Sequence, residues 1–131
     1  MKSAQLHNFG QILLVGAGEM SREYLRVLHA LEVDFTVVCR SKSSAKKFSE
    51  QTGHPAISGG LKFFFKDNKN NISTAIVAVG VENLANVSMQ LLQNGINKIL
   101  IEKPAGIFFK EITDLARLAN NHKASVFVAY N

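Results

Sequence analysis

Residues 11–21, which read Gln-Ile-Leu-Leu-Val-Gly-Ala-Gly-Glu-Met-Ser, decide the fold of this 131-residue chain. The apolar run at 11–15 is typical of a strand that is buried on both faces. The glycines that follow predict a tight turn that opens a helix. That helix is expected to pack through one apolar face, formed by Met20, Tyr24, Val27, Leu28 and Leu31.

The turn itself matches the start of the dinucleotide-binding fingerprint G-x-G-x-x-G/A. Gly16 would make the turn, and Gly18 would let the backbone approach a pyrophosphate held by the free N–H groups of the helix. Ser21 takes the third position of the fingerprint and is small enough for close packing of helix on strand. A glycine turn that merely connects two elements is the alternative. The residues expected to bind the cofactor here are Gly16, Ala17, Gly18, Glu19 and Met20.

Strands and helices are predicted to alternate along the rest of the chain. Further strands are expected at 34–39, 74–79, 98–101 and 125–129, with a short one at 56–58. Helices are expected at 43–52, 61–66, 84–92 and 112–119, and Gly53 is expected to cap the first of these. This order predicts an α/β fold in one domain, 1–131: a Rossmann-type, doubly wound parallel sheet of about six strands with helices on both faces.

The end of the second strand bears on the choice of nucleotide. An acidic residue usually grips the ribose hydroxyls of NAD at this place, but the sequence there is Cys39-Arg40-Ser41-Lys42. Arg40 could pair with a 2′-phosphate and Ser41 could hydrogen-bond to it, whereas a carboxylate would repel it. The sequence therefore favours NADP as cofactor, with NAD as the alternative.

The fifth expected strand ends in Ile101-Glu102-Lys103-Pro104. Ligands of open α/β sheets bind outside the carboxyl ends of the strands, so Lys103 would project toward the reacting end of a dinucleotide. Its amine could give a proton to an oxygen that gains charge during hydride transfer. The Lys103–Pro104 bond is a candidate cis peptide.

With these residues, the chain resembles the N-terminal domain of the Gfo/Idh/MocA oxidoreductase family. The matching stretches are 15–18, 91–95, 98–104 and 128–131. The resemblance implies that Lys103 is catalytic and that Glu102 and Pro104 lie beside the nicotinamide ribose. It also implies that Val79, Gly80 and Val81 line the cofactor, and that Tyr130 and Asn131 begin the segment that leaves the domain.

The same resemblance implies hydride transfer to or from a sugar, a cyclitol or a similar small hydroxy or carbonyl compound. Family members carry a second, C-terminal substrate domain, which this chain lacks, so we expect these 131 residues alone to be inactive. The loop at 80–86 also departs from the family, because it has neither the usual Thr-Pro pair nor the histidine. The alternative function is a stand-alone, non-catalytic nucleotide-binding or regulatory module.

The composition disfavours several other classes of protein. The net charge is +5, but the lysines are scattered and do not alternate with aromatic residues, so no nucleic-acid partner is expected. One cysteine and four widely spaced histidines predict neither a disulfide nor a metal site. No signal peptide or membrane span is expected. We expect a cytoplasmic protein without a membrane partner, and the sequence leaves open whether it forms a homo-oligomer.

Overall fold

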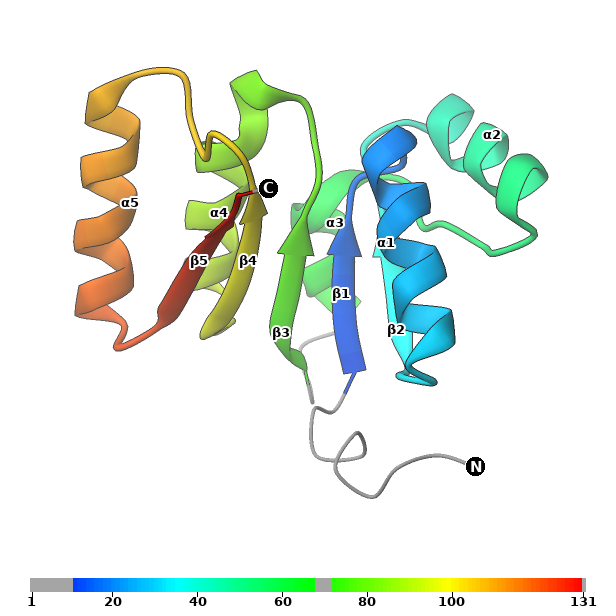
Figure 1. The fold of residues 1–131 in the computed structure, drawn as a ribbon, viewed down its shortest axis with the longest axis horizontal. Coiled ribbons are helices and arrows are strands. Elements are labelled where there is room, and N and C mark those ends of the chain that lie inside the picture. The colour runs from blue at the N-terminus through cyan, green and yellow to red at the C-terminus, as the bar shows by residue number, and fades with distance from the viewer. Residues whose placement is uncertain (1–10, 68–71, 131) are drawn as a thin grey trace.

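Five parallel strands form one sheet in the part of the chain described by the computed structural model, residues 11–67 and 72–130 (Figure 1). The strands are β1 (Gln11–Val15), β2 (Phe35–Val38), β3 (Ile72–Val77), β4 (Lys98–Glu102) and β5 (Ser125–Ala129). They are ordered β2-β1-β3-β4-β5, and each pairs with its neighbours in parallel. Their carboxyl ends therefore meet at one edge of the sheet.

Helices cover both faces of this sheet, so the predicted Rossmann-type α/β fold is confirmed. On one face lie α1 (Glu19–Ala30) and α2 (Lys42–Thr52); on the other lie α3 (Gly60–Asp67), α4 (Leu84–Gln93) and α5 (Phe109–Asn121). Figure 1 shows α1 in front of the strands and α3 and α4 behind them. A short 3-10 helix, η2 (Val81–Asn83), precedes α4. None of the helices within the described ranges combines the length and apolarity that a bilayer span requires.

The central strand explains why the run at 11–15 is apolar throughout. Leu13 and Val15 join the core under α3, α4 and α5, whereas Ile12 and Leu14 join the core under α1 and α2. Side chains of a strand alternate between faces, and here both faces are covered. A strand with two buried faces needs apolar residues at every position.

The short strand expected at 56–58 forms only a single bridge. Ile57 lies beside Val38; the Ile57 N–H donates to the Val37 carbonyl at 2.8 Å and the Ile57 carbonyl accepts from Cys39 N–H at 2.8 Å. Gly59 and Gly60 follow at once with φ of 105° and 80°, which turns the chain away into α3. The sheet accordingly has five strands where about six were expected.

The buried face of α1 also differs from the expected one. Leu28 is buried as predicted, but Ser21 and Leu25 complete the buried face. Met20, Val27 and Leu31 are exposed. The Ser21 hydroxyl donates to the carbonyl of Ala78, just after β3, at 3.5 Å, and Ser21, Leu25 and Leu28 together face the core. Met20 is thereby turned out of the core.

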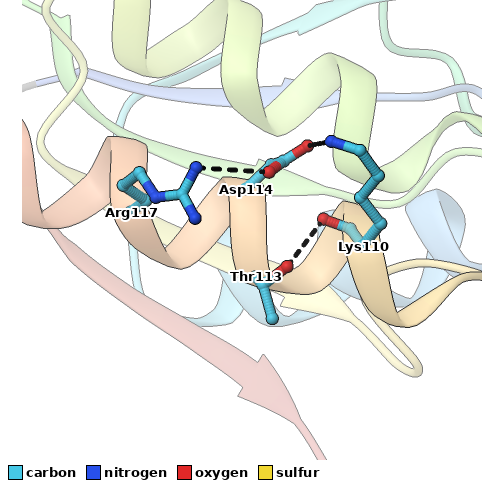
Figure 2. Close-up of polar contacts among 4 residues, drawn as sticks. All are labelled: Lys110, Thr113, Asp114 and Arg117. Atoms are coloured by element: carbon cyan, nitrogen blue, oxygen red, sulfur yellow. Dashed lines mark hydrogen bonds and ion pairs between the residues drawn. The ribbon is translucent and has the colours of Figure 1, made fainter.

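An ion-pair network runs along α5 (Figure 2). Asp114 lies between Lys110, at 2.8 Å, and Arg117, at 3.7 Å, while the Thr113 hydroxyl donates to the Lys110 carbonyl at 3.0 Å. The hydrogen bond from Lys110 lowers the pKa of the Asp114 carboxyl. Exposed pairs at helical spacing contribute little to stability, so α5 is held mainly by Leu115 and Ala119 in the core.

Candidate functional site

A cleft of about 770 Å³ opens at the carboxyl ends of β1, β2 and β3. Open α/β sheets bind ligands where the helices after adjacent strands turn to opposite faces. That switch lies between β1, which leads into α1, and β3, which leads into α4. Of the predicted cofactor-binding residues, those that line the cleft are Gly16, Ala17, Gly18, Glu19, Met20, Arg40, Ser41, Val79 and Gly80.

Gly16 is pressed against the end of the neighbouring strand. Its φ is 123°, and a Cβ built on it would lie 2.2 Å from the Ala78 carbonyl oxygen. Its N–H donates to the Val38 carbonyl at 2.8 Å. A side chain is therefore excluded both by the backbone conformation and by the space available.

Gly18 has a different environment, although it belongs to the same turn. A Cβ built on it would meet nothing within 4 Å, so the packing of the protein does not require glycine here. Gly18 is the N-cap of α1, and no side chain caps the helix. The first-turn N–H groups of α1 are thus free of a side-chain acceptor at the cleft, which suits a bound phosphate.

The end of β2 carries a cluster of hydroxyl groups beside an exposed arginine, Arg40. Ser41 is the N-cap of α2: its hydroxyl accepts from the Ser44 N–H at 3.1 Å and donates to the Ser44 hydroxyl at 2.8 Å. Ser43 lies 3.3 Å from the same oxygen. Burial raises the pKa of the neighbouring Cys39 thiol, so this cysteine does not supply a thiolate near neutral pH.

Sequence reasoning missed a second set of cleft residues. Polar members of this set are Ser44, Lys62, Glu82, Asn83, Asn86 and Gln90. The spacing of Asn83, Asn86 and Gln90 places them on one side of a helix whose apolar side is buried. That spacing could have indicated a shared face, but it does not distinguish a cleft from open solvent.

Four predicted site residues do not line the cleft: Val81, Glu102, Lys103 and Pro104. The last three form a turn at the end of β4, where the Ala105 N–H donates to the Glu102 carbonyl at 3.1 Å. The Lys103–Pro104 bond, a candidate cis peptide from the sequence, is cis. Lys103 and Pro104 are exposed and Glu102 is half-buried, so this turn lies beside the cleft lining without being part of it.

The segment after this turn is anchored by the start of α5. The Glu111 carboxylate accepts the N–H of Ile107 and of Phe108, each at 2.9 Å. Phe108 holds the N-cap position of α5 without a polar side chain, so Glu111, at position N3, makes only its own half of a capping box and binds the N–H groups that precede the helix. The loop carrying Lys103 is thereby tied to a core helix.

Tyr24 connects α1 to the same turn from the opposite face of the sheet. Burial of its phenol raises the pKa of Tyr24 to about 12, and the charge of Glu102 and a hydrogen bond to it act in the same direction. A carboxylate beside a phenol disfavours the negatively charged phenolate, and it accepts a hydrogen bond from the phenol O–H. The helix α1, which begins at the glycine turn, and the turn at Glu102 are thus in direct contact through Tyr24.

A family model confirms what the residues predicted. It describes an oxidoreductase family with an NAD-binding Rossmann fold, named for Gfo, Idh and MocA, and it matches residues 11–130. The chain belongs to the Gfo/Idh/MocA oxidoreductase family. No curated protein matched the sequence.

Solved structures of low identity share the fold of this Gfo/Idh/MocA chain. GenD2 from gentamicin A biosynthesis, in complex with NAD, is 22% identical with a TM-score of 0.76. UDP-N-acetylglucosamine 3-dehydrogenase from Acidithiobacillus ferrooxidans is 15% identical with a TM-score of 0.74, and the 3-ketoreductase KijD10 from Actinomadura kijaniata, in complex with TDP-benzene and NADP, is 19% identical with a TM-score of 0.73. The alignments cover 91%, 91% and 90% of this chain but only 34%, 37% and 36% of those structures.

Two further observations concern other parts of the Gfo/Idh/MocA domain. Tyr130, at the end of β5, is exposed, and Asn131 lies outside the described residues. Within residues 11–67 and 72–130, no group of three or more histidine, cysteine, aspartate or glutamate side chains is arranged to hold a metal ion.

The two glycines of the turn should respond differently to alanine. Gly16→Ala should lower the free energy of unfolding by more than about 2 kcal/mol, because it combines a positive φ with a backbone clash. Gly18→Ala should change it by less than about 1 kcal/mol, because its side chain enters the cleft. Urea unfolding of both variants measures this. Equal destabilisation by the two substitutions would contradict the conclusion that, of these two positions, only Gly16 must be glycine for the protein to pack.

The ionisation of Tyr24 should report its contact with Glu102. In a Tyr130→Phe background, the remaining phenol should titrate by ultraviolet absorbance with a pKa of about 12, and Glu102→Gln should lower that pKa. The pKa of Tyr24 in the folded protein exceeds its unfolded value of about 10. The protonated phenol therefore contributes its full share to the free energy of unfolding below pH 10, and this contribution is lost as pH rises through 12. Tyr24→Phe should remove this part of the alkaline loss of stability. A midpoint near 10 with Glu102 intact would refute the contact.

Proposed function

We propose that this chain is the cofactor-binding domain of an NADP-preferring oxidoreductase that transfers a hydride to or from a sugar, a cyclitol or a similar hydroxy or carbonyl compound. The observation that carries the proposal is the cleft at the switch between β1 and β3, lined by the glycine turn at its centre and by Arg40 at the end of β2. Membership of an oxidoreductase family with an NAD-binding Rossmann fold sets the reaction class.

The glycine turn fits a pyrophosphate. Gly18 leaves open space above the uncapped first turn of α1, where N–H groups and the helix dipole favour an anion. Gly16, Ala17, Glu19 and Met20 form the rest of this wall. A side chain at position 18 would occupy the space that the phosphates need.

The preference for NADP follows from the charge at the end of β2. Arg40 lines the cleft there, and Ser41 opens α2 beside it. A guanidinium can pair with a 2′-phosphate through two parallel hydrogen bonds. Among the described residues lining the cleft, the carboxylates are Glu19 and Glu82, which follow β1 and β3, so neither comes from β2.

The reacting end of the cofactor would lie toward β3 and β4. We assign Val79, Gly80 and Val81 to its binding at the end of β3, and Glu102 and Pro104 to the neighbourhood of the nicotinamide ribose. When bound, the nicotinamide supplies or accepts the hydride. In the direction of reduction, the Lys103 ammonium donates a proton to the carbonyl oxygen that gains charge; in the direction of oxidation, the Lys103 amine takes the hydroxyl proton.

The substrate class rests on similarity. One structural neighbour is a UDP-N-acetylglucosamine 3-dehydrogenase and another is a 3-ketoreductase bound to a TDP compound and NADP. Both names describe redox change at a carbon bearing a hydroxyl or carbonyl group. A polar, sugar-like substrate of this kind is what we propose for the enzyme that carries this domain.

Titration of the protein with NADPH and with NADH tests the cofactor preference. NADPH should bind at least about tenfold more tightly, and Arg40→Ala should remove most of that difference while NADH binding stays unchanged, because only the 2′-phosphate distinguishes the two nucleotides. Arg22→Ala on α1, outside the cleft lining, is the matched control. Equal binding of NADH and NADPH by the unaltered protein would overturn the preference.

Replacement of the lysine tests its proton role. In the enzyme that carries this domain, Lys103→Ala should lower kcat by about 10² to 10⁴ while the Kd for NADPH stays within twofold. Lys98→Ala, at the start of β4 and so at the opposite end of the strand that precedes Lys103, should change neither quantity. Unchanged turnover with Lys103→Ala would remove this residue from the mechanism.

A further inference from the structure

The first turn of α3 is fixed beside the strand end that carries Arg40. The Gly59 N–H donates to the Arg40 carbonyl at 3.1 Å, and the Gly60 N–H donates to the Cys39 carbonyl at 3.0 Å. Gly59 is held at φ 105°, and a Cβ built on it would lie 2.9 Å from the Phe63 ring. These contacts place Lys62, on the first turn of α3, at the same end of the cleft as Arg40.

Two cations therefore line this end of the cleft, one from each of two elements. Arg40 comes from the end of β2 and Lys62 from α3, and both are exposed. The carboxylates Glu19 and Glu82 follow β1 and β3. The cationic side chains that line the cleft therefore lie at its β2 end, and its carboxylates follow the other two strands.

The hydroxyl of Ser41 is already hydrogen-bonded at the start of α2. Its proton is donated to the Ser44 hydroxyl, and its oxygen accepts the Ser44 N–H to cap α2. A doubly charged phosphate has three acceptor oxygens, and Arg40 supplies one planar fork of donors. A further donor is needed, and Ser44 and Lys62 are polar groups that line this part of the cleft.

We propose that Lys62 is a specificity-determining residue whose ammonium binds the 2′-phosphate of NADP together with the Arg40 guanidinium. The inference rests on the proposed function and adds a second cation to it. Lysine acts as a flexible point charge whereas arginine binds in a fixed plane, so the two can hold one phosphate from different directions. The sequence around Arg40 gives no sign of this, because Lys62 is brought there by the backbone pairing of Gly59 and Gly60.

The test compares Lys62→Met with Lys66→Met, which removes an exposed lysine from the same helix outside the cleft lining. The full-length protein is titrated calorimetrically with NADPH and NADH, and with the fragments 2′,5′-ADP and 5′-AMP. Lys62→Met should raise the Kd for NADPH and for 2′,5′-ADP by about tenfold, and it should leave the Kd for NADH and for 5′-AMP within twofold. Lys66→Met should leave all four unchanged, and Lys62→Arg should retain most of the binding.

The outcomes separate this inference from the function on which it rests. Equal weakening of phosphorylated and unphosphorylated ligands by Lys62→Met, or no weakening of either, overturns the role of Lys62 even if NADPH still binds best to the unaltered protein. Binding of 2′,5′-ADP that depends on Lys62 without binding of either dinucleotide overturns the proposed function and keeps the phosphate site. Absence of binding by 2′,5′-ADP and by NADPH overturns both.

Discussion

The site depends on the contact between Gly16 and the end of β3. The Gly16 N–H bonds to the Val38 carbonyl at the end of β2, and the Ala78 N–H bonds to the Val15 carbonyl at the end of β1. With a Cβ excluded at 2.2 Å from the Ala78 oxygen, three strand ends converge on one glycine. Because α1 leaves this point toward one face and α4 toward the other, the cleft opens beside this glycine.

Because of this contact, the two glycines of the turn have different roles. Gly16 is required by the packing of the protein itself, while Gly18 is left without a neighbour and faces the space that a ligand would use. With Ser21, Leu25 and Leu28 of α1 facing the core, Met20 lines the cleft. A single strand-to-helix connection thus separates positions that maintain the fold from positions that are open to binding.

The sequence predicted the parts of this molecule that depend on local pattern. The run at 11–15, the glycine turn, the cap at Gly53 and the cis bond before Pro104 all follow from neighbouring residues, and the structure has each of them. The rotation of α1 was predicted wrongly, since an apolar stripe does not reveal that one of its members, Met20, lines a cleft. The place of Lys62 was missed because it results from backbone bonds between Gly59–Gly60 and the end of β2, and such pairing leaves no signal in side-chain periodicity.

The Glu102–Pro104 turn lies outside the cleft lining but is connected to the cleft through the helix α1. From one face of the sheet Tyr24, three residues beyond Ser21 on α1, lies against Glu102; from the other face Glu111 of α5 binds the backbone that follows the turn. A loop held by two core helices loses little further conformational freedom when a ligand arrives. One of these helices, α1, begins at the glycine turn and contacts Glu102 through Tyr24. The two parts of the site are therefore joined through the helix that opens the cleft, although no lining residue is shared between them.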